Sequence, residues 1–179
     1  MNIFNPMTLV GIHSLLSVVA LVSGIPVVVG LLRSRIEPLW TVVFLITAVA
    51  TSISGFGLPA HMLLPSHVVG ILSLLVLAAT IFAQYQFHLA GSWRWIYAAG
   101  AVAAEYFLVF VAIAQAFFKV PPLAQLAASS PTPFAATQLA ALVVFIGLCI
   151  AAMLKFRPGS TPATAPEHDQ TGSPGQARG

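Results

Sequence analysis

The stretch that decides the fold is residues 8–32, TLVGIHSLLSVVALVSGIPVVVGLL, which contains no Asp, Glu, Lys or Arg. At about 1.5 Å per residue, a helix of this length exceeds the roughly 30 Å hydrocarbon core of a bilayer. Residues 1–7 carry no basic side chain, and the apolar run continues well past the length of a signal-peptide core. We therefore expect a retained transmembrane helix, tilted in the membrane or bent at Pro26.

Four further apolar runs follow along the chain. With the first run they predict five transmembrane spans, at about 8–32, 39–56, 66–88, 93–118 and 134–156. Only 6% of the 179 residues are charged and the mean hydropathy is +0.97, whereas a soluble domain has roughly 25% charged residues. Long unbroken runs favour helices over the short alternating strands of a membrane barrel. The predicted class is all-α, with residues 1–157 forming one helical bundle in the membrane.

Residues 158–179 differ sharply from the rest of the chain, because they are rich in Pro, Gly, Ser, Thr, Ala and Gln. Such a segment buries too little apolar area to offset the entropy of ordering it. We predict that it is a disordered tail.

The basic residues predict the orientation of the bundle. Five spans put most of them on one side of the membrane, and only Lys119 falls on the other side. The larger set is Arg33, Arg35, Arg94, Lys155 and Arg157. By the positive-inside rule this side is cytoplasmic, so we expect a bacterial inner-membrane protein with its N-terminus outside and its tail in the cytoplasm. No block of basic residues indicates nucleic-acid binding, and the expected partner is the lipid bilayer.

Two histidines lie in the half of the bundle that should face outward. His13 begins a stripe of small residues that continues through Ser17, Ala20 and Gly24, so its ring should point into the bundle. His67 lies at the start of the third span. Two histidines from different helices can supply both axial ligands of a b-type haem. His61 with His13 and His67 gives an alternative, an outward-facing metal site.

Glu105 is the one acidic residue inside an expected span, and it lies near the bilayer midplane. Without a cationic partner its carboxyl group is expected to be neutral, able to donate a hydrogen bond. Other polar side chains concentrate between the midplane and the outer face. Together with Glu105 they predict a polar pocket formed by Ser17, Thr51, Ser54, Gln115 and Gln138.

Several functions remain open from the residues alone. The first is a redox-associated protein that holds one haem or metal ion through His13 and His67, with Glu105 tuning the site. The second is a non-catalytic component that assembles with other membrane subunits, or with itself, through faces of small residues. The third is a small proton-linked transporter built on Glu105 and Gln115. The buried polar residues also have a purely structural interpretation, in which their hydrogen bonds fix the register of the bundle.

Five segments resemble a group of small bacterial multi-pass membrane proteins of unassigned function. The segments are GIHS (11–14), TSISGF (51–56), LPSHVVG (64–70), WRWIY (93–97) and QAFFKVP (115–121). The resemblance covers about residues 8–157 and implies no activity. The chain is more loosely similar to small haem-b membrane proteins of the cytochrome b561 type, in span number and in histidines within helices. It departs from them in lacking two well-matched histidine pairs.

Overall fold

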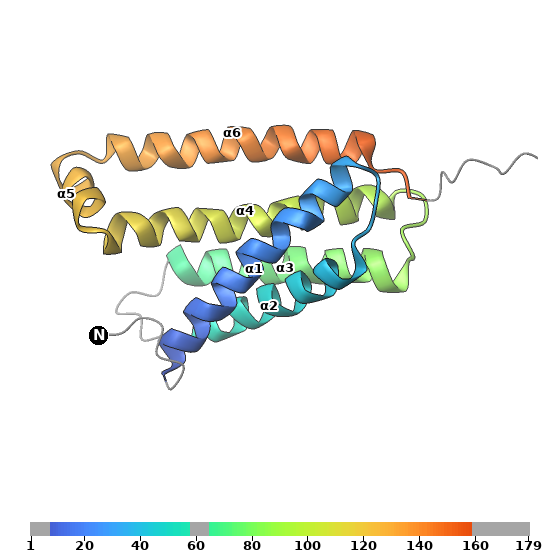
Figure 1. Cartoon of the computed structure of the whole chain (residues 1–179), viewed down its shortest axis with the longest axis horizontal. Coiled ribbons are helices and arrows are strands. Elements are labelled where there is room, and N and C mark those ends of the chain that lie inside the picture. The colour runs from blue at the N-terminus through green and yellow to red at the C-terminus, as the bar shows by residue number, and fades with distance from the viewer. Residues whose placement is uncertain (1–7, 58–64, 159–179) are drawn as a thin grey trace, which may run out of the picture.

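The computed structural model describes residues 8–57 and 65–158 (Figure 1). These residues form helices and no strand. The helices are α1 (Leu9–Leu32), α2 (Pro38–Phe56), α3 (Pro65–Ile81), the π-helical turn η1 (Phe82–Gln86), α4 (Trp93–Lys119), α5 (Pro121–Ser129) and α6 (Thr132–Lys155). Five helices, the third measured as His67–Gln86, are long and apolar enough to cross a membrane. The predicted all-α class with five long apolar helices is confirmed. His61 and the predicted disordered tail beyond residue 158 lie outside the described residues.

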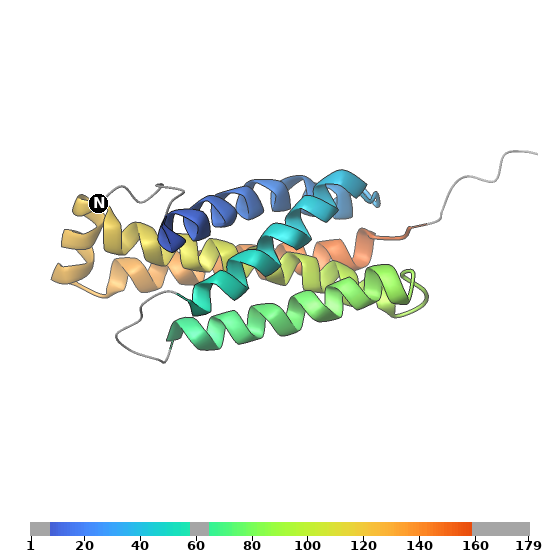
Figure 2. The ribbon, with the colours of Figure 1, turned by 90° about the horizontal axis from the view of Figure 1, so that it is seen from below.

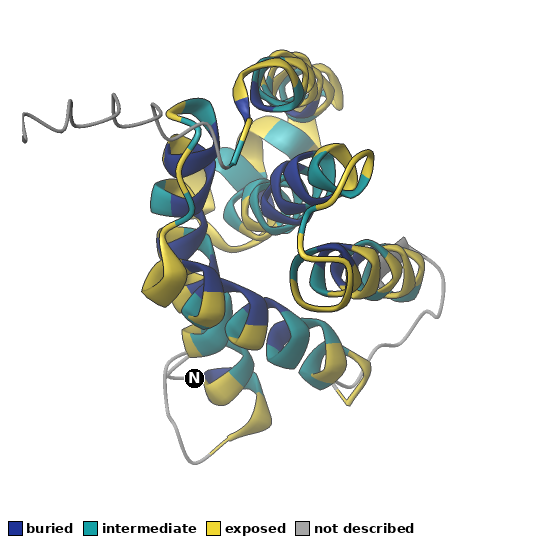
Figure 3. Cartoon of the chain, turned by 90° about the vertical axis from the view of Figure 1, so that its right-hand side faces the viewer, coloured by how far each residue is buried: buried dark blue, intermediate teal, exposed yellow. Residues whose placement is uncertain are grey.

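Helix α4 occupies the centre of the bundle. It contacts α1, α3, α5 and α6, while α2 packs against α1 and α3. Figures 1 and 2 show α4 and α6 running side by side and α1 crossing them at an angle. Seen from one end, the buried faces of the helices turn inward and the exposed faces turn outward (Figure 3). We call the two ends of the bundle the Lys119 end, where α4 finishes, and the Arg94 end, where α4 starts.

Helix α1 begins and ends as its sequence requires. The Thr8 side chain accepts a hydrogen bond from the Gly11 backbone N–H at 3.1 Å, which caps the helix. The helix then runs without interruption through Pro26. Beyond Leu32, Ser34 adopts a left-handed φ of 56°, and the Arg35 N–H donates to the Gly30 carbonyl at 2.9 Å. This short turn reverses the chain and leads into α2 as an antiparallel neighbour.

The third span ends differently from the expected single helix over 66–88. The α-helix finishes at Ile81 and one π-helical turn follows to Gln86. His88, Leu89 and Gly91 then have φ values of 47°, 59° and 54°, so the backbone leaves the right-handed helical region. The rings of Phe87 and Trp93 stack 3.7 Å apart across this turn, which fixes the start of α4.

A short helix, α5, lies between the predicted fourth and fifth spans. Pro121 and Pro122 occupy its first positions, where the fixed φ of proline suits a helix start and the missing N–H costs nothing. No residue of α5 is buried, and the helix contacts α4 and α6. It therefore caps the Lys119 end of these two helices.

Candidate functional site

Glu105 lies in the interior of the bundle, near the middle of α4. Its neighbours on the buried face of this helix are Tyr97, Ala98, Ala101 and Ala104. Only 4% of Glu105 is exposed. The small side chains around it allow other helices to approach α4 closely. The predicted inward orientation of this carboxyl group agrees with its burial.

The Glu105 carboxyl group fits against Gly24 of α1. A Cβ atom at position 24 would overlap the carboxyl group and would lie 2.9 Å from Cε2 of Phe44 on α2. A larger residue at this position therefore forces the Glu105 carboxyl group and the Phe44 ring to move. The Oε2 atom of Glu105 is buried and has no hydrogen-bond partner among the described residues. A carboxylate in this position would be an uncompensated charge, so the arrangement suits the neutral acid.

A second group of polar side chains lies between α1 and α2 toward the Lys119 end. The Nδ1 atom of His13 is 2.9 Å from the Ser54 hydroxyl, which donates to the Thr51 carbonyl at 3.1 Å. The imidazole and the hydroxyl are thus hydrogen-bonded to each other, and the tautomer of the ring sets which of them donates. Ser17 donates to the His13 carbonyl at 2.7 Å. Three of the predicted pocket residues, Ser17, Thr51 and Ser54, thus come together with His13 here. The Thr51 hydroxyl oxygen is buried and has no hydrogen-bond partner among the residues that the structure describes.

His67 has different neighbours from His13. Its ring packs edge-on against Phe56, with centroids 5.5 Å apart, and its buried Nδ1 atom has no hydrogen-bond partner among residues 8–57 and 65–158. Ser54, which holds His13, and Phe56 are two positions apart on α2. At 100° per residue they project from roughly opposite sides of that helix. The two histidines therefore contact α2 on different sides, and their shared ligation of a haem stays a prediction.

The two glutamines do not join either group. Gln115 is exposed. Gln138 of α6 donates from Nε2 to the Phe110 carbonyl of α4 at 3.0 Å, while its buried Oε1 atom has no partner within the described part of the chain. The predicted pocket is thus divided into a histidine–hydroxyl group between α1 and α2, the Glu105 carboxyl group on α4, and an amide between α4 and α6.

Polar contacts that sequence reasoning missed lie elsewhere in the bundle. The Thr41 hydroxyl and the Tyr97 hydroxyl are both buried and 3.4 Å apart, toward the Arg94 end. The hydroxyl groups of Ser52 on α2 and Ser73 on α3 form a hydrogen bond, with their oxygens 3.1 Å apart. Buried polar groups therefore also lie at the Arg94 end, and not in the predicted half of the bundle alone. The burial of Thr41 could have been predicted from its spacing, because it lies on the same face of α2 as Phe44, Ala48 and Thr51.

Neither metal-ligand geometry nor similarity to known proteins identifies a function for this chain. Across residues 8–57 and 65–158, no three His, Cys, Asp or Glu side chains gather in a way that could hold a metal ion. Cys149 is a free thiol, half-buried in α6. No family model, no curated protein and no solved structure matches the chain, so the family resemblance described above stays a prediction.

Proposed function

We propose that this chain is a small proton-linked membrane transport protein in which Glu105 carries the proton. The observation behind the proposal is the Oε2 atom of Glu105, which is buried among three helices and has no hydrogen-bond partner in the part of the chain that the structure describes. A polar residue that only fixes helix register would be expected to pair its buried atoms. Acidic side chains inside membrane bundles mark functional sites, among them proton relays.

Polar groups on both sides of Glu105 support a route along the bundle. Toward the Lys119 end lie the bonded pair His13 and Ser54, and toward the Arg94 end lie Thr41 and Tyr97. Imidazole and hydroxyl groups can both accept and donate protons. Between His13 and Glu105 the interior is lined by small side chains such as Ala20 and Ala48. Transfer across that apolar interval requires water to enter the bundle during the cycle.

The proton-linked function accounts for more of the arrangement than a haem or metal does. A haem bound through two axial histidines needs both rings at one iron atom. His13 and His67 instead contact opposite sides of α2 through Ser54 and Phe56. The proton-linked proposal needs no such pairing, because it rests on Glu105 alone.

Proton flux into liposomes tests the proposal. The full-length protein is reconstituted with a trapped pH-sensitive dye, and a potassium diffusion potential drives protons inward. The Glu105→Gln variant keeps the shape of the side chain but cannot release a proton, so its flux should fall to that of protein-free liposomes. Glu37→Gln removes a carboxyl group at the Arg94 end and should retain the wild-type flux. Wild-type flux equal to the protein-free background, or equal flux in wild type and Glu105→Gln, contradicts the proposal.

We further infer that the Arg94 end faces the cytoplasm of a bacterial inner membrane. The Arg94 guanidinium donates to the Phe156 carbonyl at 3.3 Å, and the Arg157 N–H donates to the Ser34 hydroxyl at 2.8 Å. These bonds draw the basic segments after α1 and α6 and at the start of α4 to one end, which suits the positive-inside rule. A C-terminal alkaline phosphatase fusion should be inactive. An active fusion would reverse the orientation.

A further inference from the structure

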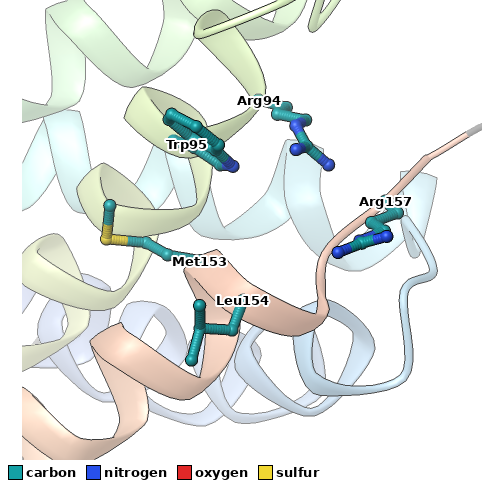
Figure 4. A pocket seen from close by; sticks show the side chains of 5 residues that line it. All are labelled: Arg94, Trp95, Met153, Leu154 and Arg157. Carbon is teal, nitrogen blue, oxygen red and sulfur yellow. The ribbon is translucent and has the colours of Figure 1, made fainter.

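A pocket opens at the Arg94 end, between the start of α4 and the end of α6 (Figure 4). Its volume is about 250 Å³, and its lining consists of Arg94, Trp95, Met153, Leu154 and Arg157. In Figure 4 the two guanidinium groups reach the same side of the pocket from different segments, while Met153 and Leu154 form another wall. The pocket thus combines a cationic side with an apolar side.

The cationic side is held in place by the bundle. Arg94 donates from Nη1 to the Phe156 carbonyl at 3.3 Å, and its guanidinium carbon lies 5.1 Å from the centre of the Trp95 ring. Phe156 is fully buried and packs on Tyr97. The bond to Phe156 uses one of the five N–H donors of an arginine. The hydrogen bond thus holds the Arg94 guanidinium in place and leaves its remaining N–H groups able to bind a ligand.

The apolar side continues along the outside of the bundle. Leu154 is 69% exposed, and Ile150, one turn earlier on the same helix, is 54% exposed. Trp95 is also exposed at this level, as tryptophans at the edge of a membrane commonly are. The pocket therefore lies where the headgroup layer meets the hydrocarbon. A ligand that suits it has an anionic head and an apolar chain.

We propose that this pocket binds the headgroup phosphate of an anionic phospholipid, with one acyl chain lying along α6. Guanidinium groups bind phosphate oxygens through paired, charge-assisted hydrogen bonds. Basic pockets between transmembrane helices on the cytoplasmic side recognise lipid headgroups in this way. The site is separate from Glu105, and it does not depend on proton transfer.

Lipid retained by the purified full-length protein tests this site. The protein is equilibrated with equal amounts of phosphatidylglycerol and phosphatidylcholine in detergent, and the bound lipids are counted by native mass spectrometry. The double variant Arg94→Gln/Arg157→Gln is compared with Arg33→Gln/Arg35→Gln, which removes two positive charges from the same end. Retained phosphatidylglycerol should fall about tenfold or more in the first variant, and by less than about twofold in the second.

A third variant separates a shaped pocket from a simple surface charge. Met153→Trp keeps both arginines but fills the cavity, so it should also lose phosphatidylglycerol. Far-UV circular dichroism checks that each variant keeps its helices, and the Met153→Trp result decides the matter if the arginine variant unfolds. Equal losses in both arginine variants, equal retention of the two lipids, or full retention in Met153→Trp overturns the proposal. So does displacement of the lipid by inorganic phosphate alone.

Discussion

Helices α1 and α6 have the same length and nearly the same mean hydropathy, but they differ greatly in packing. Within the apolar window of α1, 39% of the residues are buried, compared with 11% for α6. Helix α1 contacts α2, α4 and, over a smaller area, α6, whereas α6 packs mainly on α4. Hydrophobicity therefore does not decide which helix lies inside, because lipid tails solvate leucine and valine as well as another helix does.

The glycines of the two helices differ in how closely other atoms approach them. The buried face of α1 includes Gly11, Ala20, Gly24 and Gly30. At Gly24 and Gly30 an added Cβ would come within 3.0 Å or less of Glu105 or the Arg35 carbonyl. In contrast, a Cβ at Gly147 of α6 would have nothing within 4 Å. Close approach of the backbones, rather than apolar character, places α1 in the bundle.

The largest expected loss of stability comes from substituting Gly24 in α1, the better-packed helix. Gly24→Ala should lower the free energy of unfolding by about 2 kcal/mol, because both the Glu105 carboxyl group and the Phe44 ring must move. Gly147→Ala makes the same change in open surroundings and should cost nothing. Reversible unfolding by sodium dodecyl sulfate in mixed micelles, followed by circular dichroism, measures both.

A double-mutant cycle identifies the group that Gly24 accommodates. In a Glu105→Ala background the carboxyl group is absent, so Gly24→Ala should cost less than it does in the wild type. An unchanged cost in that background would assign the close approach to Phe44 alone. Equal costs for Gly24→Ala and Gly147→Ala would remove the distinction between the two helices.

The sequence was sufficient to predict the class of fold and the inward faces of several helices. Run lengths and a few charged residues gave five apolar helices, and the stripe through His13, Ser17 and Gly24 gave the interior face of α1. It did not show that Gly24 and Glu105 meet, because that depends on the angle at which α1 crosses α4. The same crossing angle explains why Gln115 is exposed. Near the Lys119 end α1 has moved away from α4, so this side chain is exposed rather than in the pocket.

The next largest difference in stability is expected between substitutions of two valines, one buried in α4 and one exposed on α6. Val102 of α4 is 1% exposed, and Val143 of α6 is 61% exposed. Val102→Ala should lower the free energy of unfolding by about 1 kcal/mol, because it leaves a cavity between packed helices. Val143→Ala should change it by no more than about 0.3 kcal/mol, since lipid refills the space. A loss at Val143 as large as that at Val102 would mean that another protein surface covers α6.

The smallest expected effect concerns the hydrogen bond between His13 and Ser54. Removing the hydroxyl with Ser54→Ala leaves Nδ1 of His13 without its partner, and interhelical hydrogen bonds in membranes average about 0.6 kcal/mol. Ser14→Ala is the matched control on α1, because Ser14 donates to the Val10 carbonyl of its own helix. The same unfolding measurement should therefore show a loss for Ser54→Ala that exceeds the loss for Ser14→Ala. Equal values would mean that the histidine contributes nothing to holding α1 against α2, and that the close approach at Gly24 fixes their packing without it.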